Sequence, residues 1–184
     1  MKITVIRSNR KSVSISVKED GIVVVKAPLF LPHKQIEKIV EDKKKWINER
    51  ILIMRECYKD VQALTIEEIN SLSDQALKEI PKRVEHYAKL LGVTYNHITI
   101  RCQKTKWGSC SSKGNLNFNC LLMLTPPEVI DSIVVHELCH LKCMNHSKKF
   151  YEEVLKFYPD YRKWDKWIKD NGSRIMARRP RLIL

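Results

Sequence analysis

The segment His136-Glu137-Leu138-Cys139-His140 constrains this chain more than any other part of its sequence. On a helix, residues i and i+4 lie one above the other on a single face, so both imidazoles can reach one metal ion. Glu137 is angled off that face, where its carboxylate can take a proton from a metal-bound water without being a ligand. Neutral imidazoles with an open coordination position favour zinc, so the segment predicts a zinc-binding helix.

The residues before this segment predict a helix that leads into it. Thr125-Pro126-Pro127-Glu128 has the form of a helix start, with Thr125 as N-cap and Glu128 placed for a capping box. The apolar run Ile133-Val134-Val135 indicates that the helix is largely buried. Two histidines and a glutamate can also form an ordinary polar helix face. However, buried histidines without partners are unfavourable, which supports the metal interpretation.

A catalytic zinc site needs a third protein ligand, and His146 is the first candidate. It follows His136 by ten residues, enough chain to leave the helix and return to the metal. Metzincins share this spacing, but Cys143 stands where their pattern has glycine, so we do not assign the chain to them. Glu152 and Glu153 are alternative third ligands. Three tyrosines are candidates to stabilise an oxyanion, namely Tyr151, Tyr158 and Tyr161.

Hydrophobic periodicity predicts an α+β protein. Alternation predicts strands at 12–17 and 22–25, joined as a hairpin by a turn at 19–21, and a helix from about 32 to 52. A capping box at Thr65 starts another helix, and a longer helix follows that ends near Gly92 and is kinked or begun at Pro81. Strands at 98–101 and 116–120 read as an antiparallel hairpin. We therefore expect an N-terminal hairpin and helix module over 1–60 and a second domain over 61–184.

Composition bounds the class of protein. The chain has 184 residues and a net charge of +13, from 34 basic and 21 acidic side chains. It has no apolar run long enough to span a bilayer and no signal-peptide pattern, so we expect a cytoplasmic protein without a membrane partner. Its six cysteines form no Cys-x-x-Cys pair and read as buried packing residues. The basic surplus indicates either solvated helix faces or a nucleic-acid partner.

Several motifs follow one another in the order typical of one family. They are Lys106-Trp107-Gly108-Ser109-Cys110-Ser111, Asn115-Leu116-Asn117-Phe118-Asn119, Pro127-Glu128-Val129-Ile130-Asp131, the segment 136–140, and Asn145-His146-Ser147 with Phe150. Together they resemble the YgjP-like metal-dependent hydrolases, a zinc metallopeptidase-like family distantly related to SprT-like and WLM proteases. Segments near residues 7–12, 27–28 and 46–47 extend the resemblance over nearly the whole chain.

The resemblance implies a minimal zincin-like core, with a metal-binding helix, packing helices and a small antiparallel sheet. It implies zinc ligation by His136, His140 and His146, with Glu137 as general base of a metallopeptidase. In such enzymes a polypeptide substrate pairs with an edge strand above the metal. The strand 115–120 is the candidate edge, with Asn117 and Asn119 as substrate contacts.

Other interpretations remain open at this stage. Residues 107–110 would lie near the cleft, or form a turn with Trp107 in the core. A metal-dependent hydrolase of another amide or ester would use the same ligands and base. A DNA-associated protein would explain the positive charge, and a structural zinc domain is disfavoured because three histidines leave a coordination position open.

Overall fold

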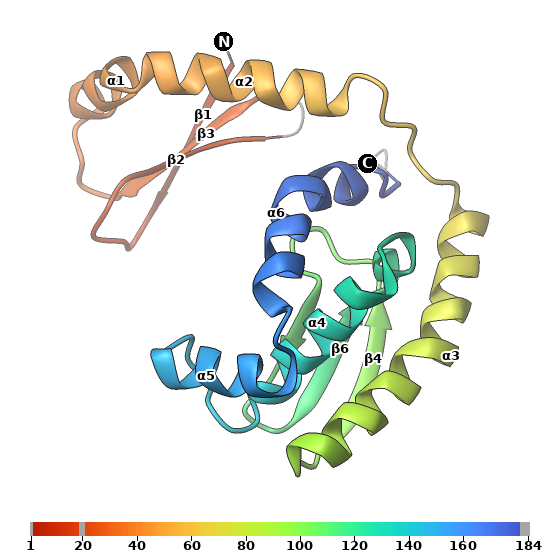
Figure 1. The fold of residues 1–184 in the computed structure, drawn as a ribbon. Coiled ribbons are helices and arrows are strands. Elements are labelled where there is room, and N and C mark those ends of the chain that lie inside the picture. Colours follow the sequence, from red (N-terminus) through yellow and green to blue (C-terminus); the bar gives the residue numbers. More distant parts are fainter. Residues whose placement is uncertain (1, 19–20, 181–184) are drawn as a thin grey trace. The chain divides into compact units, whose positions relative to one another are not determined.

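The computed structural model describes residues 2–18 and 21–180. The contacts divide the chain into two compact units, Met1–Val61 and Gln62–Leu184 (Figure 1). Each unit combines helices with a three-stranded sheet, which confirms the predicted α+β class. The division lies one residue from the predicted domain boundary. That each unit folds by itself stays a prediction.

The sheet of the first unit has the order β1-β3-β2, with β1 at Ile3–Ser8, β2 at Ser14–Val17 and β3 at Val23–Pro28. The predicted hairpin is present, since β2 and β3 are antiparallel, although its turn at 19–20 lies outside the described residues. Strand β1 pairs with β3 in parallel, a long-range pairing that alternation alone does not reveal. The central strand β3 carries three buried valines, Val23, Val24 and Val25.

Two helices follow in place of the single predicted one. Helix α1 spans His33–Asp42 and α2 spans Lys44–Tyr58, with the break at Lys43. Lys43 has a φ of −100° and a ψ of 7°, outside helical geometry. Ile36 and Val40 of α1 and Ile47 of α2 join the buried face of β3 in one apolar cluster. Burying residues from both helices against β3 requires a change of direction that periodicity alone does not show.

The second unit begins with the long helix α3 at Ile66–Leu91. The predicted capping box is confirmed: the Glu68 amide donates to Thr65 Oγ1 at 3.2 Å, and the Thr65 amide donates to Glu68 Oε2 at 2.7 Å. Gly92 ends the helix with a φ of 65°, a left-handed conformation that glycine adopts without strain. The helix runs through Pro81 because its buried stripe continues on both sides, at Ile80 and Val84.

The second sheet corrects two predictions. Its strands are β4 at His97–Arg101, β5 at Gly108–Cys110 and β6 at Asn115–Asn119, in the order β4-β6-β5. The segment expected to be a loop contains β5, which forms the antiparallel hairpin with β6, whereas β4 and β6 are parallel. The sheet is therefore mixed. Strand β6 is central and is not the edge that the sequence suggested.

Four helical segments complete the unit: the short 3-10 helix at Cys120–Leu124, α4 at Pro127–Cys139, α5 at Lys148–Phe157 and α6 at Tyr161–Ala177. Helix α4 packs against α3, α5, α6 and β5 and lies at the centre of the unit. Its Val134, Val135 and Leu138 are fully buried. No helix in the described part of the chain is long and apolar enough to cross a membrane.

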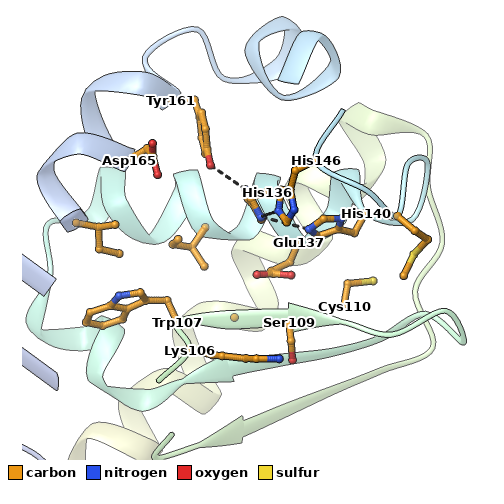
Figure 2. A pocket seen from close by; sticks show the side chains of 14 residues that line it. Lys106, Trp107, Ser109, Cys110, His136, Glu137, His140, His146, Tyr161 and Asp165 are labelled. Atoms are coloured by element: carbon orange, nitrogen blue, oxygen red, sulfur yellow. Dashed lines mark hydrogen bonds between the residues drawn. The ribbon is translucent and has the colours of Figure 1, made fainter. Parts of the chain in front are cut away.

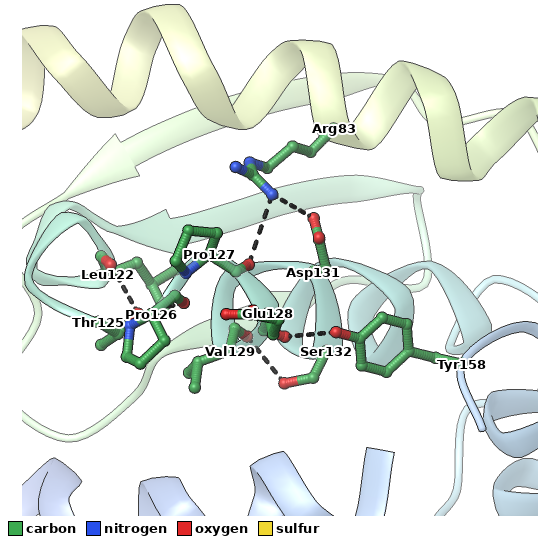
Figure 3. Close-up of polar contacts among 10 residues, drawn as sticks. All are labelled: Arg83, Leu122, Thr125, Pro126, Pro127, Glu128, Val129, Asp131, Ser132 and Tyr158. Atoms are coloured by element: carbon green, nitrogen blue, oxygen red, sulfur yellow. Dashed lines mark hydrogen bonds and ion pairs between the residues drawn. The ribbon is translucent and has the colours of Figure 1, made fainter. Parts of the chain in front are cut away.

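The first turn of α4 is held by tertiary contacts (Figure 3). The expected Thr125 cap is absent, because Thr125 Oγ1 donates to the Leu122 carbonyl at 2.7 Å and Pro126 occupies the N-cap position. Arg83 of α3 pairs with Asp131 at 2.6 Å, and the Tyr158 hydroxyl donates to the Glu128 carbonyl at 2.9 Å. Proline has no amide hydrogen to cap, so side chains from α3 and the end of α5 fasten this turn instead.

Candidate metal centre

Three imidazoles converge at the end of α4 (Figure 2). His136 and His140 lie one turn apart, and the chain beyond Cys139 turns so that His146 returns to the same place. The Nε2 atom of His136 lies 3.2 Å from Nε2 of His140 and 3.0 Å from Nε2 of His146. The structure thus brings the three predicted ligands together.

The distances fit a single metal ion. Tetrahedral ligands at the usual zinc–nitrogen distance of about 2.05 Å lie about 3.3 Å apart, close to the observed separations. The ligand atoms of all three residues lie within 4.8 Å of one another. Phe150 of α5 stacks on His140 with ring centroids 4.5 Å apart and meets the other two rings edge-on. A rigid aromatic support therefore fixes the three rings.

The outer nitrogens of two imidazoles have hydrogen-bond partners, and the carbonyl partner of His140 can only accept. His140 Nδ1 lies 3.2 Å from the Cys143 carbonyl, and His136 Nδ1 lies 2.8 Å from the Tyr161 hydroxyl. When Nδ1 carries the proton, it donates to these oxygens and leaves the Nε2 lone pair free to bind a metal ion. Burial and the neighbouring histidines lower the pKa of His136 to about 3, so it is neutral at neutral pH. Burial also lowers the pKa of His140.

Glu137 lies beside the imidazoles and faces strand β5 (Figure 2). Only 6% of its surface is exposed. Burial raises the pKa of its carboxyl group to about 8, opposed in part by the positive charge of Lys106 and by a hydrogen bond from the Cys110 backbone. A carboxyl group with a pKa near neutral pH suits proton transfer.

These groups border a pocket of about 450 Å³. Its lining includes all three histidines, Glu137 and Tyr161, together with the segment Lys106–Cys110. The pocket opens to solvent, so a substrate can reach the imidazoles. Of the two interpretations of residues 107–110, the cleft position is the one observed, and Trp107 is also partly buried against the core.

Of the alternative metal ligands and oxyanion-stabilising candidates, only one lies at the pocket. Glu153 pairs with Lys142 at 3.1 Å and Glu152 with Lys148 at 3.7 Å, and neither belongs to the group of three metal-binding side chains. The Tyr158 hydroxyl is hydrogen-bonded to the Glu128 carbonyl at the start of α4, and Tyr151 does not line the pocket. Tyr161 is the candidate that lines the pocket, and its hydroxyl contacts His136.

Neither Asn117 nor Asn119, the predicted substrate contacts, lines the pocket. Asn119 is fully buried, and its amide nitrogen donates to the carbonyls of Gln103 and Lys106, each at 2.9 Å. It therefore shapes the loop that precedes β5. Asn117 lies in the central strand, 3.4 Å from the Ser109 hydroxyl, and does not line the pocket. The strand beside the pocket is β5, whose three residues are too few to show alternation in sequence.

Gly108 of β5 allows the close approach of Glu137. A Cβ atom at this position would lie 2.7 Å from both Cγ and Oε1 of Glu137. Real Cβ contacts are not this short, so any larger residue would displace the carboxylate. Residues of the motif 106–111 thus serve the site through their backbone as well as their side chains.

Comparison with known proteins agrees with this geometry. Residues 60–171 match the family model of the YgjP-like metallopeptidase domain. The chain belongs to the YgjP-like metallopeptidase family. This confirms the resemblance in sequence and indicates a hydrolase of polypeptides that uses a metal ion.

Two solved structures are similar to part of this YgjP-like chain. The metallopeptidase zymogen of Pyrococcus abyssi abylysin is 26% identical, with 50% of this chain and 95% of that chain covered and a TM-score of 0.46. The metallopeptidase zymogen of Methanocaldococcus jannaschii jannalysin is 24% identical, with 51% and 97% covered and a TM-score of 0.46. No curated protein sequence matches the chain.

Gly108→Ala should lower kcat for peptide hydrolysis by about 10- to 100-fold while metal binding is retained, because misplacement of an active-site group by about 1 Å has effects of this size. The three atoms nearest to the added methyl group all belong to the Glu137 side chain, so its main effect is to displace that carboxylate. Ser112→Ala, in the exposed turn after β5, is the control. Unchanged kcat in Gly108→Ala would show that the position of Glu137 is not critical.

In the metal-free protein, the free energy of unfolding should fall by about 1 kcal/mol between pH 6.5 and 8. Glu137 has a pKa of about 8 when folded against 4.5 ordinarily, so the folded state keeps a proton that the unfolded state has released. Below pH 6.5 the lowered pKa of His136 acts in the opposite direction, because the unfolded state then binds more protons. Between about pH 4.5 and 6.5 the two effects offset each other, so stability should be nearly level there and fall above pH 6.5.

Urea unfolding of chelator-treated protein at several pH values measures this slope. Glu137→Gln has no such proton to lose and should be nearly flat from pH 6.5 to 8. Equal slopes in the wild type and Glu137→Gln would contradict the assigned pKa.

Proposed function

We propose that this chain is a zinc-dependent metallopeptidase in which His136, His140 and His146 hold the metal and Glu137 is the general base. The observation that carries the proposal is the convergence of three imidazoles beside a buried glutamate in an open pocket, with Nε2 of His136 3.2 Å from that of His140 and 3.0 Å from that of His146. Three nitrogen ligands leave one coordination position open, as in catalytic zinc sites. A structural site would instead have four protein ligands.

Each residue has a distinct part in the proposed reaction. When bound, zinc would supply a Lewis acid that polarises the scissile carbonyl and lowers the pKa of water toward about 7. Glu137 accepts the proton of the attacking water at its carboxylate and then donates it to the leaving amine. The charge of Lys106 lowers the pKa of Glu137 and so favours the ionised carboxylate against the opposite effect of burial. Tyr161 orients His136 through Nδ1.

Strand β5 is the proposed docking edge for the polypeptide. It ends the sheet order β4-β6-β5, so its outer side has no neighbouring strand among the described residues, and all three of its residues line the pocket. An extended peptide can add to such an edge through backbone hydrogen bonds. We therefore propose residues 108–110 as the edge strand that binds the peptide, in place of residues 115–120.

Hydrolysis of another amide or an ester would use the same ligands and base, and substrate comparison separates these activities from peptide hydrolysis. The DNA-associated alternative has only the net charge of +13 in its favour, and neither the family match nor the site supports it. We therefore do not propose nucleic acid as a partner.

Metal removal and return tests the proposed function. An unfolded protein such as reduced casein, incubated with the purified chain, should be cleaved at neutral pH. A strong chelator should abolish cleavage, and one equivalent of Zn²⁺ should restore it, whereas Mg²⁺ should not, because it prefers oxygen ligands. Cleavage that survives complete removal of metal would contradict the proposal.

A further inference from the structure

The pocket beside the imidazoles is uneven in charge. In Figure 2, Lys106 is drawn below Glu137, whereas Asp165 and Trp107 border the end of the pocket away from His140 and Cys110, Asp165 above and Trp107 below. Among the described residues that line the pocket, Asp165 and Glu137 are the two carboxylates. A substrate side chain that enters the end beside Asp165 therefore meets a negative charge outside the catalytic centre.

The walls of this end are apolar and fixed. Trp107, Ile133 and Ile168 line it, and each is partly buried. The indole of Trp107 lies against Gly172 of α6, where a Cβ would come within 3.1 Å of Cζ2 and 3.2 Å of Nε1. Close packing on a glycine holds the ring in place. Apolar walls with a carboxylate at the rim suit a long aliphatic stem that ends in a cation. A tryptophan face adds cation–π attraction.

Asp165 already has a cationic neighbour, but one that leaves it available. Lys169, one turn further along α6, lies 2.6 Å from Asp165 Oδ2. The Lys169 side chain is 69% exposed and the Asp165 side chain 32%. Exposed pairs of this kind are weak, and a carboxylate has about four lone-pair sites. A guanidinium or ammonium group that is shielded from water in the pocket can therefore bind Asp165 beside Lys169 or displace it.

We propose that the pocket formed by Trp107, Ile133, Asp165 and Ile168, here named the Asp165 pocket, selects substrates with arginine or lysine next to the scissile bond. This inference rests on the proposed function, because the pocket adjoins the three imidazoles and Glu137. It names a substrate class, polypeptides with a basic residue at the cleavage site, and assigns the selection to Asp165.

Matched peptides test the proposal. Two pairs are needed, with arginine or its neutral isostere citrulline placed directly before or directly after the scissile bond. For the zinc-loaded wild type, kcat/KM should be about 5- to 20-fold higher for arginine at one of the two positions, the range expected of a partly buried charged hydrogen bond. Asp165→Asn should bring this ratio close to one. Lys169→Gln should raise the ratio, because Asp165 loses its competing partner.

Asp170→Asn, an exposed change on the same helix, is the matched control and should keep the wild-type ratio. A ratio near one at both positions in the wild type, or a wild-type ratio in Asp165→Asn, would overturn the proposal. Titration calorimetry of the same peptides with zinc-loaded Glu137→Gln separates it from the proposed function. Tighter binding of arginine peptides, again 5- to 20-fold, without any cleavage by the wild type would retain the Asp165 pocket and reject the peptidase.

Discussion

Glu137→Gln should reduce kcat for peptide hydrolysis by about 10²- to 10⁴-fold, the usual contribution of a general base, while zinc content stays near one ion per chain. Glutamine fills the same buried space against Gly108 but cannot accept the proton of the attacking water. A fluorogenic peptide gives kcat, and elemental mass spectrometry of the same samples gives the zinc content.

The control for this substitution is Glu152→Gln, an exposed change whose pairing with Lys148 is long, at 3.7 Å. We expect wild-type kcat in the control. Two outcomes would contradict the assigned role of Glu137. Retained kcat in Glu137→Gln would show that another group is the base, and loss of zinc with activity would show that Glu137 is a ligand.

His136→Ala and His146→Ala should each lose nearly all bound zinc, with less than about one tenth of an ion per chain after purification, because two nitrogen ligands hold the ion far less tightly than three. Removal of His136 also takes away the contact with Tyr161. The melting temperature in excess zinc should fall toward that of the metal-free wild type, since binding no longer stabilises the folded state.

His86→Ala, on the exposed face of α3 and outside the three-histidine group, is the control and should keep its zinc. Zinc that is lost in His136→Ala but kept in His146→Ala would contradict the three-histidine assignment. In that event Glu152 and Glu153 would again become the candidates for the third ligand.

The metal centre is the part of the molecule that the sequence predicts best, because its geometry is mostly local. The spacing of His136 and His140 on a helix determines that they share a face, and His146 is near enough in sequence to return to them. The capping box at Thr65 and the end of α3 at Gly92 are predictable for the same reason. In each case the interacting groups lie within a few residues of one another.

The strand order depends on long-range contacts, and the prediction that 115–120 is an edge strand was wrong for this reason. Alternation in 115–119 marks a strand but does not say whether it is central or at an edge. Asn119 looks like an exposed polar residue in that pattern, yet it is buried because its amide group holds the loop carbonyls of Gln103 and Lys106. Strand β5 has three residues, Gly108–Cys110, and such a short Gly-Ser-Cys segment has no strand signature of its own.

The start of α4 shows a similar limit. Thr125 and Glu128 match the capping pattern, but two prolines remove amide hydrogens from the first turn. The turn is held instead by Arg83, which pairs with Asp131, and by Tyr158, which donates to the Glu128 carbonyl. Such contacts become visible only once α3 and α5 have packed against α4.

X-ray absorption at the zinc K-edge of the zinc-loaded protein tests the central claim most directly. The account predicts three imidazole nitrogens and one oxygen, all near 2.0 Å, and no sulfur in the first shell. Cys110 lines the same pocket, and Cys143 lies in the turn that carries His146, so a thiolate ligand is the chemical alternative. A sulfur ligand near 2.3 Å, or four protein ligands with no open position, would contradict a three-histidine catalytic centre.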